Sequence, residues 1–357
     1  MKGILGPAII ILSLFSALYA QNSTGKIFSK EWAYPEIQES PAKKNLINVK
    51  APTCQIPPEG TREFGSIDGL GLDKNDNLYV WDNGYNALFK FSPDGKKLWR
   101  KKYEKDGKAE GTFGNVGLAF TVSESGQIAL GDKSGRTISL LDSSGKFIRR
   151  FKVDMLPGAI TFGKDGDIYV TGFGFSYKGD LVQHYSSAGH FINAFCKREN
   201  DSKAIDWSGN SGRLSTDKDG NIYFSHFYPY RIEKFSKDGI LLKKIEQNRE
   251  NFIAPIIVNN SGAKMVECPS GLRSISFIPQ GYLSVAVFYN QREGKWNMDL
   301  FDLDGNLKAA ISQSSYPVPF YCRCSASDSK GNLYYDVDAG IEPAIIKYSV
   351  NYNELVK

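Results

Sequence analysis

The chain has 357 residues, of which 23% are charged, and its formal net charge is +5. Together with a mean hydropathy of −0.34, these values exclude a disordered chain and a protein built largely of membrane spans. The positive charge is modest and Lys and Arg are dispersed, which argues against nucleic acid as a partner. Aromatic residues make up 13% of the chain and there are 35 Gly, a balance that favours many short strands joined by tight turns.

The first 20 residues are typical of a secretory signal peptide. Lys2 gives a positive start, an apolar run extends from Ile4 to Leu18, and the small residue Ala20 suits cleavage before Gln21. An uncleaved N-terminal anchor is the alternative. Because no second long apolar stretch follows, the mature chain is expected to be secreted, periplasmic or part of the cell envelope, without a membrane span.

One sequence pattern recurs along the rest of the chain: an apolar stretch, a polar turn, two stretches in which apolar and polar residues alternate, a turn ending in Gly and a final apolar stretch. Its equivalent apolar residues are Leu78, Ile128, Ile168, Ile222, Leu283 and Leu333. The repeat length of about 50 residues accommodates four short strands with their loops. Stacking six such sheets radially buries the faces that a single sheet would expose. The sequence therefore predicts an all-β, six-bladed β-propeller with four antiparallel strands per blade, over residues 61–357.

Two of these copies resemble the NHL repeat. Leu72–Asp82 reads Leu-Asp-Lys-Asn-Asp-Asn-Leu-Tyr-Val-Trp-Asp, and Thr216–Phe224 reads Thr-Asp-Lys-Asp-Gly-Asn-Ile-Tyr-Phe. The resemblance to NHL-repeat propellers of exported bacterial proteins covers residues 60–357. It implies the propeller fold and leaves the activity open, because such propellers include lyases, lactonases, receptors and adaptors.

Closure of the ring is predicted from the C-terminal end. Tyr348–Leu355 aligns with Phe91–Leu98, the outer part of the first repeat, so blade six is expected to supply all four of its strands. Residues 21–60 would then form an N-terminal extension that packs on the seam between blades six and one. A disulfide from Cys54 to Cys322 or Cys324 would clip this seam, and Cys196 with Cys268 is a second candidate pair. A monomer is expected.

In a propeller, the loops that lead into the innermost strands and those that join strands two and three surround one mouth of the ring, which is the default ligand site. Here these loops are rich in aromatic and basic residues. Guanidinium groups bind carboxylates, and aromatic rings suit sugars and apolar side chains. The alternative is that the aromatics pack between blades and the arginines pair with nearby acids. The predicted ligand-binding residues are Asp68, Trp81, Tyr85, Phe175, Tyr177, Arg213, His226, Tyr228, Arg231, Arg273 and Arg323.

Enzymatic chemistry finds little support in the sequence. At the inner-strand positions, three arginines argue against the central calcium of lactonase-like propellers, which needs oxygen ligands. The chain has only three histidines, His184, His190 and His226, too few for a zinc site or triad built on histidine. No catalytic residue, metal or cofactor is therefore predicted.

The leading interpretation is an exported, non-enzymatic binding scaffold for a peptide, glycan or protein partner. The alternative is a metal-dependent hydrolase or lyase that uses Asp68, His226 and the arginines. A structural protein of the cell envelope is the third possibility.

Overall fold

The computed structural model describes residues 54–56, 63–173, 178–198, 210–260, 263–290, 295–312, 322–338 and 343–354. The chain divides into two compact units, Met1–Glu39 and Ser40–Lys357. All described residues belong to the second unit. The expected signal peptide and most of the expected N-terminal extension therefore lie outside the described residues.

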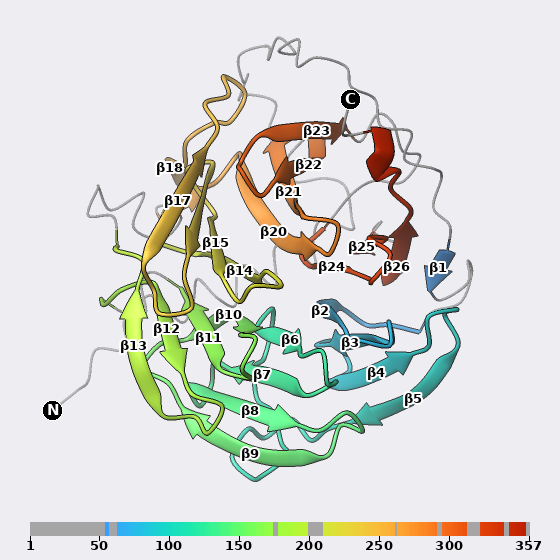
Figure 1. Ribbon diagram of the computed structural model, residues 1–357. Coiled ribbons are helices and arrows are strands. Elements are labelled where there is room, and N and C mark those ends of the chain that lie inside the picture. The colour runs from blue at the N-terminus through green and yellow to red at the C-terminus, as the bar shows by residue number, and fades with distance from the viewer. Residues whose placement is uncertain are drawn as a thin grey trace, which may run out of the picture. The chain divides into compact units, whose positions relative to one another are not determined.

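The described part of the second unit forms six four-stranded antiparallel sheets, and each is one blade of a β-propeller (Figure 1). The strands of the first three blades, from the innermost outward, are β2 (Ile67–Leu72), β3 (Leu78–Asp82), β4 (Ala87–Phe91) and β5 (Lys97–Lys102); β6 (Phe120–Val122), β7 (Ile128–Asp132), β8 (Thr137–Leu141) and β9 (Phe147–Lys152); β10 (Pro157–Phe162), β11 (Ile168–Gly172), β12 (Val182–Tyr185) and β13 (Phe191–Phe195). Those of the last three are β14 (Gly212–Thr216), β15 (Ile222–His226), β16 (Arg231–Phe235) and β17 (Leu241–Glu246); β20 (Gly271–Ile278), β21 (Tyr282–Asn290), β22 (Lys295–Asp302) and β23 (Leu307–Ser312); β24 (Ser325–Ser327), β25 (Leu333–Asp338), β26 (Pro343–Tyr348) and β1 (Cys54–Ile56).

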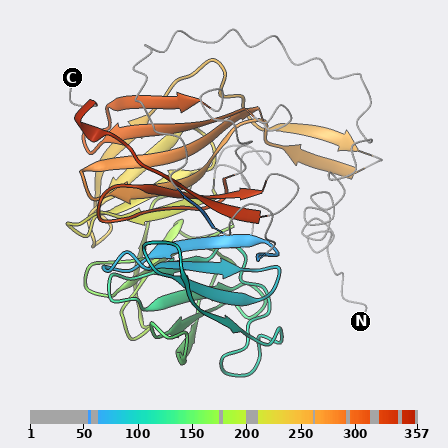
Figure 2. The ribbon, with the colours of Figure 1, turned by 90° about the vertical axis from the view of Figure 1, so that its right-hand side faces the viewer.

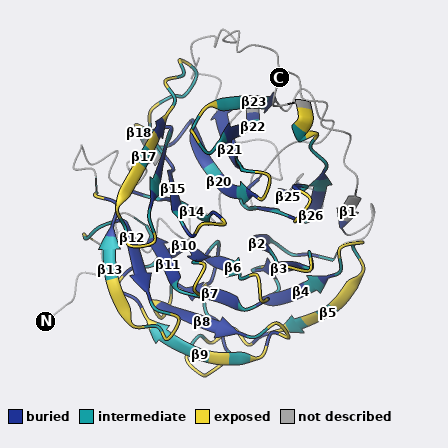
Figure 3. Cartoon of the chain, viewed as in Figure 1, coloured by how far each residue is buried: buried dark blue, intermediate teal, exposed yellow. Residues whose placement is uncertain are grey.

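The innermost strands close a ring. β2 contacts β6, and the contacts continue through β10, β14, β20 and β24 back to β2. Among the blade strands, exposed residues are concentrated on the outermost strands β5, β9, β13 and β17, whereas the inner strands are largely buried (Figure 3). The six-bladed propeller predicted from the repeats is therefore confirmed.

Blade six closes differently from the prediction. Its outermost strand is β1, which runs antiparallel to β26 with Cys54 opposite Lys347 and Ile56 opposite Ile345. The segment expected to form this strand instead contains a 3-10 helix, η3 (Tyr352–Glu354). The Tyr352 ring stacks on Tyr282, and its hydroxyl donates to the Gly331 carbonyl at 2.5 Å, which holds this segment away from the sheet edge. The ring is thus closed by a strand from the N-terminal side pairing with C-terminal strands.

The expected disulfides are absent: Cys196, Cys268, Cys322 and Cys324 are free thiols. For Cys54 the strand order gives the reason, because β1 and β24 lie at opposite edges of blade six. Three strand spacings separate them, roughly 14 Å, whereas a disulfide requires Cα atoms within about 7 Å. Cys322 and Cys324 lie beside the innermost strand and cannot reach Cys54.

A buried aspartate explains why the repeated sequence pattern is preserved in several blades. In blade one, Asp73 accepts the Asn75 and Asn77 amides at 3.0 Å, and also receives the Tyr79 hydroxyl at 3.2 Å and the Lys90 ammonium at 3.4 Å. The carboxylate thus satisfies the turn between strands one and two and links it to strand three. The same four residue types meet in blades four and six, as Asp217, Asn221, Tyr223 and Lys234, and as Asp328, Asn332, Tyr334 and Lys347.

Neighbouring blades pack through aromatic residues and glycines. Trp81 is fully buried and lies against Tyr103 and Phe113, with ring centroids 6.3 and 5.9 Å away. Gly69 on β2 allows β6 to approach, because a Cβ there would lie 2.5 Å from the Phe120 side chain. Burying one such aromatic side chain stabilises the fold by about 1.5–3 kcal/mol.

One hairpin departs from the blade pattern. β18 (Ile256–Asn260) and β19 (Ala263–Glu267) form a separate two-stranded sheet between blades four and five, and it extends away from the blades (Figure 2). Among the described residues, no helix has the length and apolar character needed to cross a membrane.

Candidate functional site

Four basic side chains come from the same end of the ring. Arg213 and Arg273 lie near the starts of the adjacent innermost strands β14 and β20, and Arg323 comes just before β24. Lys133 directly follows β7, the second strand of blade two. Because β7 runs antiparallel to the innermost strand β6, the end of β7 lies at the same end of the ring as the start of β6. We call Lys133, Arg213, Arg273 and Arg323 the cationic cluster.

The members of the cluster are close enough to affect one another's ionisation. Burial, followed by the charges of Arg273 and Arg323, lowers the pKa of Arg213 to about 10. Burial and the charge of Arg213 lower the pKa of Lys133, although Asp68 opposes this. Burial raises the pKa of Asp68 despite Arg323 and Lys133. The cluster therefore concentrates positive charge on side chains that are partly buried.

Two of the arginines are not neutralised. Within the described part of the chain, arginine forms ion pairs through Arg231, Arg249 and Arg323, which leaves Arg213 and Arg273 without a carboxylate partner. Arg213 donates one bond to the neighbouring Gly212 carbonyl at 3.1 Å, and the Nε atoms of both Arg213 and Arg273 are buried without a hydrogen-bond partner. Partly buried guanidinium groups that lack a carboxylate partner are costly for a fold, and a bound anion would offset that cost.

Aromatic rings accompany the cations. The Arg273 guanidinium lies 5.2 Å from the Phe227 ring centroid and 4.7 Å from that of Phe288. The Lys133 ammonium lies 4.9 Å from the ring centroid of Phe173. Such contacts hold a cation in place without neutralising it.

Arg323 differs from the other two arginines because it has acidic partners. Its Nη1 lies 2.9 Å from Asp68 Oδ1, and its Nε lies 3.6 Å from Asp336 Oδ2. It also donates to the Ile67 carbonyl at 2.9 Å, so it joins blade six to blade one. Asp68 is therefore engaged in the seam of the ring.

From the predicted set, the structure brings together Asp68, Arg213, Arg273 and Arg323, and the other described members have different contacts. Trp81 is fully buried between blades one and two, so its ring cannot meet a ligand and that expectation was wrong. The Tyr85 ring lies 5.3 Å from Arg100 of the outermost strand β5. Phe175 and Tyr177 lie outside the described residues.

Three predicted residues of blade four have other contacts. Tyr228 stacks on Phe252 with centroids 5.7 Å apart, and Arg231 Nε donates to Glu246 at 2.6 Å. His226 is 1% exposed, which corrects its predicted place in a ligand-facing loop. It ends β15 and joins a second cluster.

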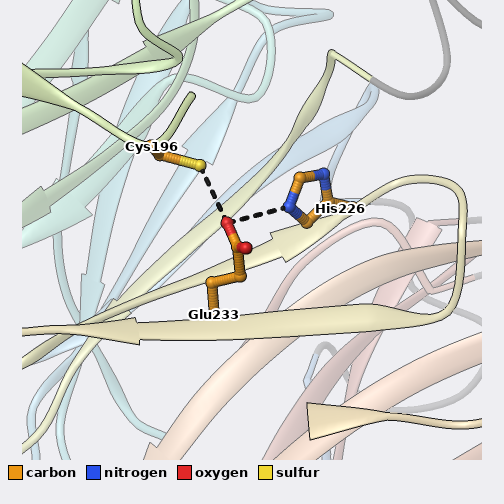
Figure 4. Close-up of side chains that lie close together, drawn as sticks. All are labelled: Cys196, His226 and Glu233. Carbon is orange, nitrogen blue, oxygen red and sulfur yellow. Dashed lines mark hydrogen bonds and ion pairs between the residues drawn. The ribbon is translucent and has the colours of Figure 1, made fainter. Parts of the chain in front are cut away.

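This second cluster contains Cys196, His226 and Glu233 (Figure 4). Glu233 Oε2 accepts from the Cys196 thiol at 3.2 Å and lies 3.3 Å from His226 Nε2. Burial alone would raise the pKa of Glu233, but the bonds and charges of His226 and Lys244, with the Cys196 bond, lower it to about 2. Burial, and then the Glu233 charge, raises the pKa of the Cys196 thiol.

Sequence reasoning missed Lys133, Cys196 and Glu233. Glu233 had a detectable signal: it lies opposite Phe224 in the sheet, where blades one and six place the apolar residues Phe89 and Ile346. A charged residue at this core position indicates a buried partner. Lys133 and Cys196 had no comparable signal, because both lie in loops outside the repeat.

No protein-family profile and no curated relative matches the chain. Solved structures do match. A DUF4221-family protein from Bacteroides vulgatus has a TM-score of 0.56 at 9% identity, covering 87% of this chain and 99% of that one. A protein of Bacteroides fragilis thought to be exported has a TM-score of 0.52 at 10% identity, covering 82% of this chain and 91% of that one. The WD40 propeller domain of Doa1 has a TM-score of 0.50 at 12% identity, covering 81% of this chain and 80% of that one. These likenesses support the propeller fold, and the resemblance to NHL repeats stays a prediction.

Proposed function

We propose that the protein is an exported binding propeller that holds an anionic group of a peptide or saccharide at the cationic cluster. The observation that carries this proposal is the pair Arg213 and Arg273, which adjacent innermost strands hold side by side without a carboxylate partner in the described part of the chain. A fold that needed these residues only for stability would have neutralised them. The cost is instead consistent with a function.

The chemistry of the cluster favours a carboxylate or sulfate carried on a ring-bearing or apolar ligand. Guanidinium groups bind such oxyanions with two parallel hydrogen bonds, and Arg213 and Arg273 both keep buried Nε donors for this purpose. Phe227, Phe288 and Phe173 surround the cations with aromatic surface. An acidic oligosaccharide matches both features best, and an acidic peptide is the closest competitor.

In the hydrolase or lyase alternative, two of the residues expected to take part in the reaction are bound to other side chains. Asp68 is paired with Arg323, and His226 is paired with Glu233. Asp68 lies beside the cationic cluster but is bound to Arg323, whereas His226 belongs to a separate buried cluster, so the two residues do not form one acid–base pair at a common site. We therefore favour binding without turnover.

A thermal-shift screen tests the proposal. Tri-galacturonate, triglutamate and inorganic phosphate would be compared with uncharged maltotriose on the wild type and on the double variant Arg213→Gln/Arg273→Gln. We expect one of the anionic oligomers to raise the melting temperature of the wild type only. Arg100→Gln/Lys152→Gln is the matched control, because it removes two positive charges from the outermost strands β5 and β9. Equal responses in both double variants would reject the proposal.

A further inference from the structure

Two blades contribute to the cluster of Cys196, His226 and Glu233. Cys196 directly follows β13, the outermost strand of blade three, whereas His226 ends β15 and Glu233 lies on β16 of blade four. All three side chains are buried, with 4%, 1% and 6% of their residue surface exposed. The cluster thus joins two blades at a point that solvent barely reaches.

The position of His226 is unusual among the blades. It has the register position that Asp82 holds in blade one and Asp132 in blade two, four residues after the first apolar residue of the second strand. Both aspartates accept backbone amides of the loop that precedes their innermost strand. In blade four an imidazole replaces this carboxylate and approaches Glu233. The replacement places an imidazole, a side-chain type that can bind a metal ion, where blades one and two have a carboxylate.

The three side chains offer one thiol, one imidazole and one carboxylate, and their ligand atoms all lie within 4.8 Å of one another. A zinc ion with bonds of about 2.0–2.3 Å holds tetrahedral ligands roughly 3.3–3.6 Å apart. The observed separations from Glu233 Oε2 are 3.2 Å to Cys196 Sγ and 3.3 Å to His226 Nε2. Small side-chain movements would therefore admit the ion.

The surroundings orient the carboxylate toward its two partners. Lys244 Nζ lies 3.0 Å from Glu233 Oε1, so the other oxygen, Oε2, faces Cys196 and His226. An outer partner that fixes one oxygen and leaves the other to the ion is typical of metal sites. Cys196 has a φ of 66°, a left-handed conformation rare outside glycine, and this aims its thiol back into the blade interface.

We propose that Cys196, His226 and Glu233 bind one zinc ion, which clamps blade three to blade four. On binding, the Cys196 thiol loses its proton to solvent and ligates as the thiolate, and no electron transfer is involved. The clamp uses residues other than the cationic cluster. The proposal therefore stands or falls independently of anion binding.

Metal content of the purified chain is the first test. After incubation with zinc sulfate and dialysis, we expect one zinc per chain in the wild type, and loss of that zinc in Cys196→Ser and His226→Gln. His184→Gln is the matched control: His184 is also buried and bonded to a carboxylate, Asp167 at 2.8 Å, but among the described residues it belongs to no cluster of three metal-ligating side chains. This control should retain the zinc. Equal zinc in the wild type and in Cys196→Ser would overturn the proposal.

Cobalt gives a test that needs no variant to fold. Cobalt(II) in place of zinc should produce a sulfur-to-metal charge-transfer band in the near ultraviolet, because the thiolate is a ligand. Zinc should also raise the melting temperature of the wild type, and chelation should reverse the rise. Bound cobalt without the sulfur band, or a melting temperature that does not respond to zinc, would contradict the site.

Discussion

Arg323 of blade six lies 2.9 Å from Asp68 of blade one, and this ion pair spans the seam at which the ring closes. The side chains of both partners are largely buried, at 20% and 9% exposure, so the pair is screened far less than a surface pair. The same seam carries the β1–β26 pairing at the outer edge of blade six. The ring is therefore closed in two places: near its axis by the ion pair between Arg323 and Asp68, and at its outer edge by the pairing of β1 with β26.

Replacing Asp68 should weaken the inner closure. In Asp68→Asn, Arg323 keeps Asp336 and the Ile67 carbonyl but loses its closest carboxylate. We expect the free energy of unfolding to fall by about 1–3 kcal/mol, measured by urea denaturation. Asp180→Asn is the control, because its partner Lys197 is 88% exposed and such pairs contribute about 0–1 kcal/mol. Equal losses of unfolding free energy in the two variants would show that the Asp68–Arg323 pair stabilises the fold no more than an exposed surface pair does.

Removal of β1 should weaken the outer closure. A chain that begins after residue 60 lacks the outermost strand of blade six and leaves β26 as an unpaired edge. We expect a lower melting temperature and a greater tendency to aggregate than in a chain that begins after residue 50. If both truncated chains melt at the same temperature, β1 is not needed to close the ring.

Arg213 should be destabilising in the absence of ligand. Its pKa is lowered in the folded state, so below about pH 10 the fold holds a charge that it disfavours, and this cost is relieved only as pH rises above that value. Arg213→Gln should therefore raise the free energy of unfolding at pH 7 by roughly 1 kcal/mol. Arg100→Gln on the outermost strand should change it by less than about 0.5 kcal/mol. A large loss of stability in Arg213→Gln would instead assign Arg213 a structural role.

Acid should destabilise the fold through the buried turn aspartates. Burial alone would raise the pKa of Asp217, but bonds from Asn221 and the ion pair with Lys234 lower it in the folded state. The unfolded state therefore binds more protons below about pH 5, so the contribution of Asp217 is present above the unfolded pKa near 3.9 and is lost as pH falls through the folded value. Asp217→Asn should cost about 1–3 kcal/mol at pH 7 and flatten the pH dependence of the urea midpoint.

Asp219→Asn provides the comparison for that measurement. Asp219 is an exposed carboxylate in the same turn, two residues away. We expect the acid limb of its stability curve to follow the wild type. A curve for Asp217→Asn that keeps the full wild-type slope would mean that other carboxylates govern the acid response.

The propeller could be predicted from the sequence because its signals are local and repeated. Residues such as Asp73, Asn77 and Tyr79 meet within one turn, and their copies in blades four and six repeat that geometry. The closure by β1 could not be predicted, since three residues carry no period of their own. Their partner β26 lies almost three hundred positions away along the chain.

The candidate site was predicted in part for the same reason. Arg213, Arg273 and Arg323 recur at matching places in successive blades, so their convergence follows from the repeat. Lys133 and Cys196 come from loops that differ between blades, and only the folded ring brings them to their partners. Trp81 was misplaced because the end of a second strand faces the neighbouring blade, where an aromatic ring packs against Tyr103 and Phe113.

The central claim is that Arg213 and Arg273 together bind an anion, and calorimetric titration measures this most directly. Tri-galacturonate would be titrated into the wild type, into Arg213→Gln/Arg273→Gln and into Arg100→Gln/Lys152→Gln, each at two salt concentrations. The account predicts saturable binding that weakens with salt, falls at least about tenfold in the first double variant, equivalent to about 1.4 kcal/mol, and is unchanged in the second. Binding of equal strength in all three proteins, or in none of them with this or any other oxyanion, would contradict it.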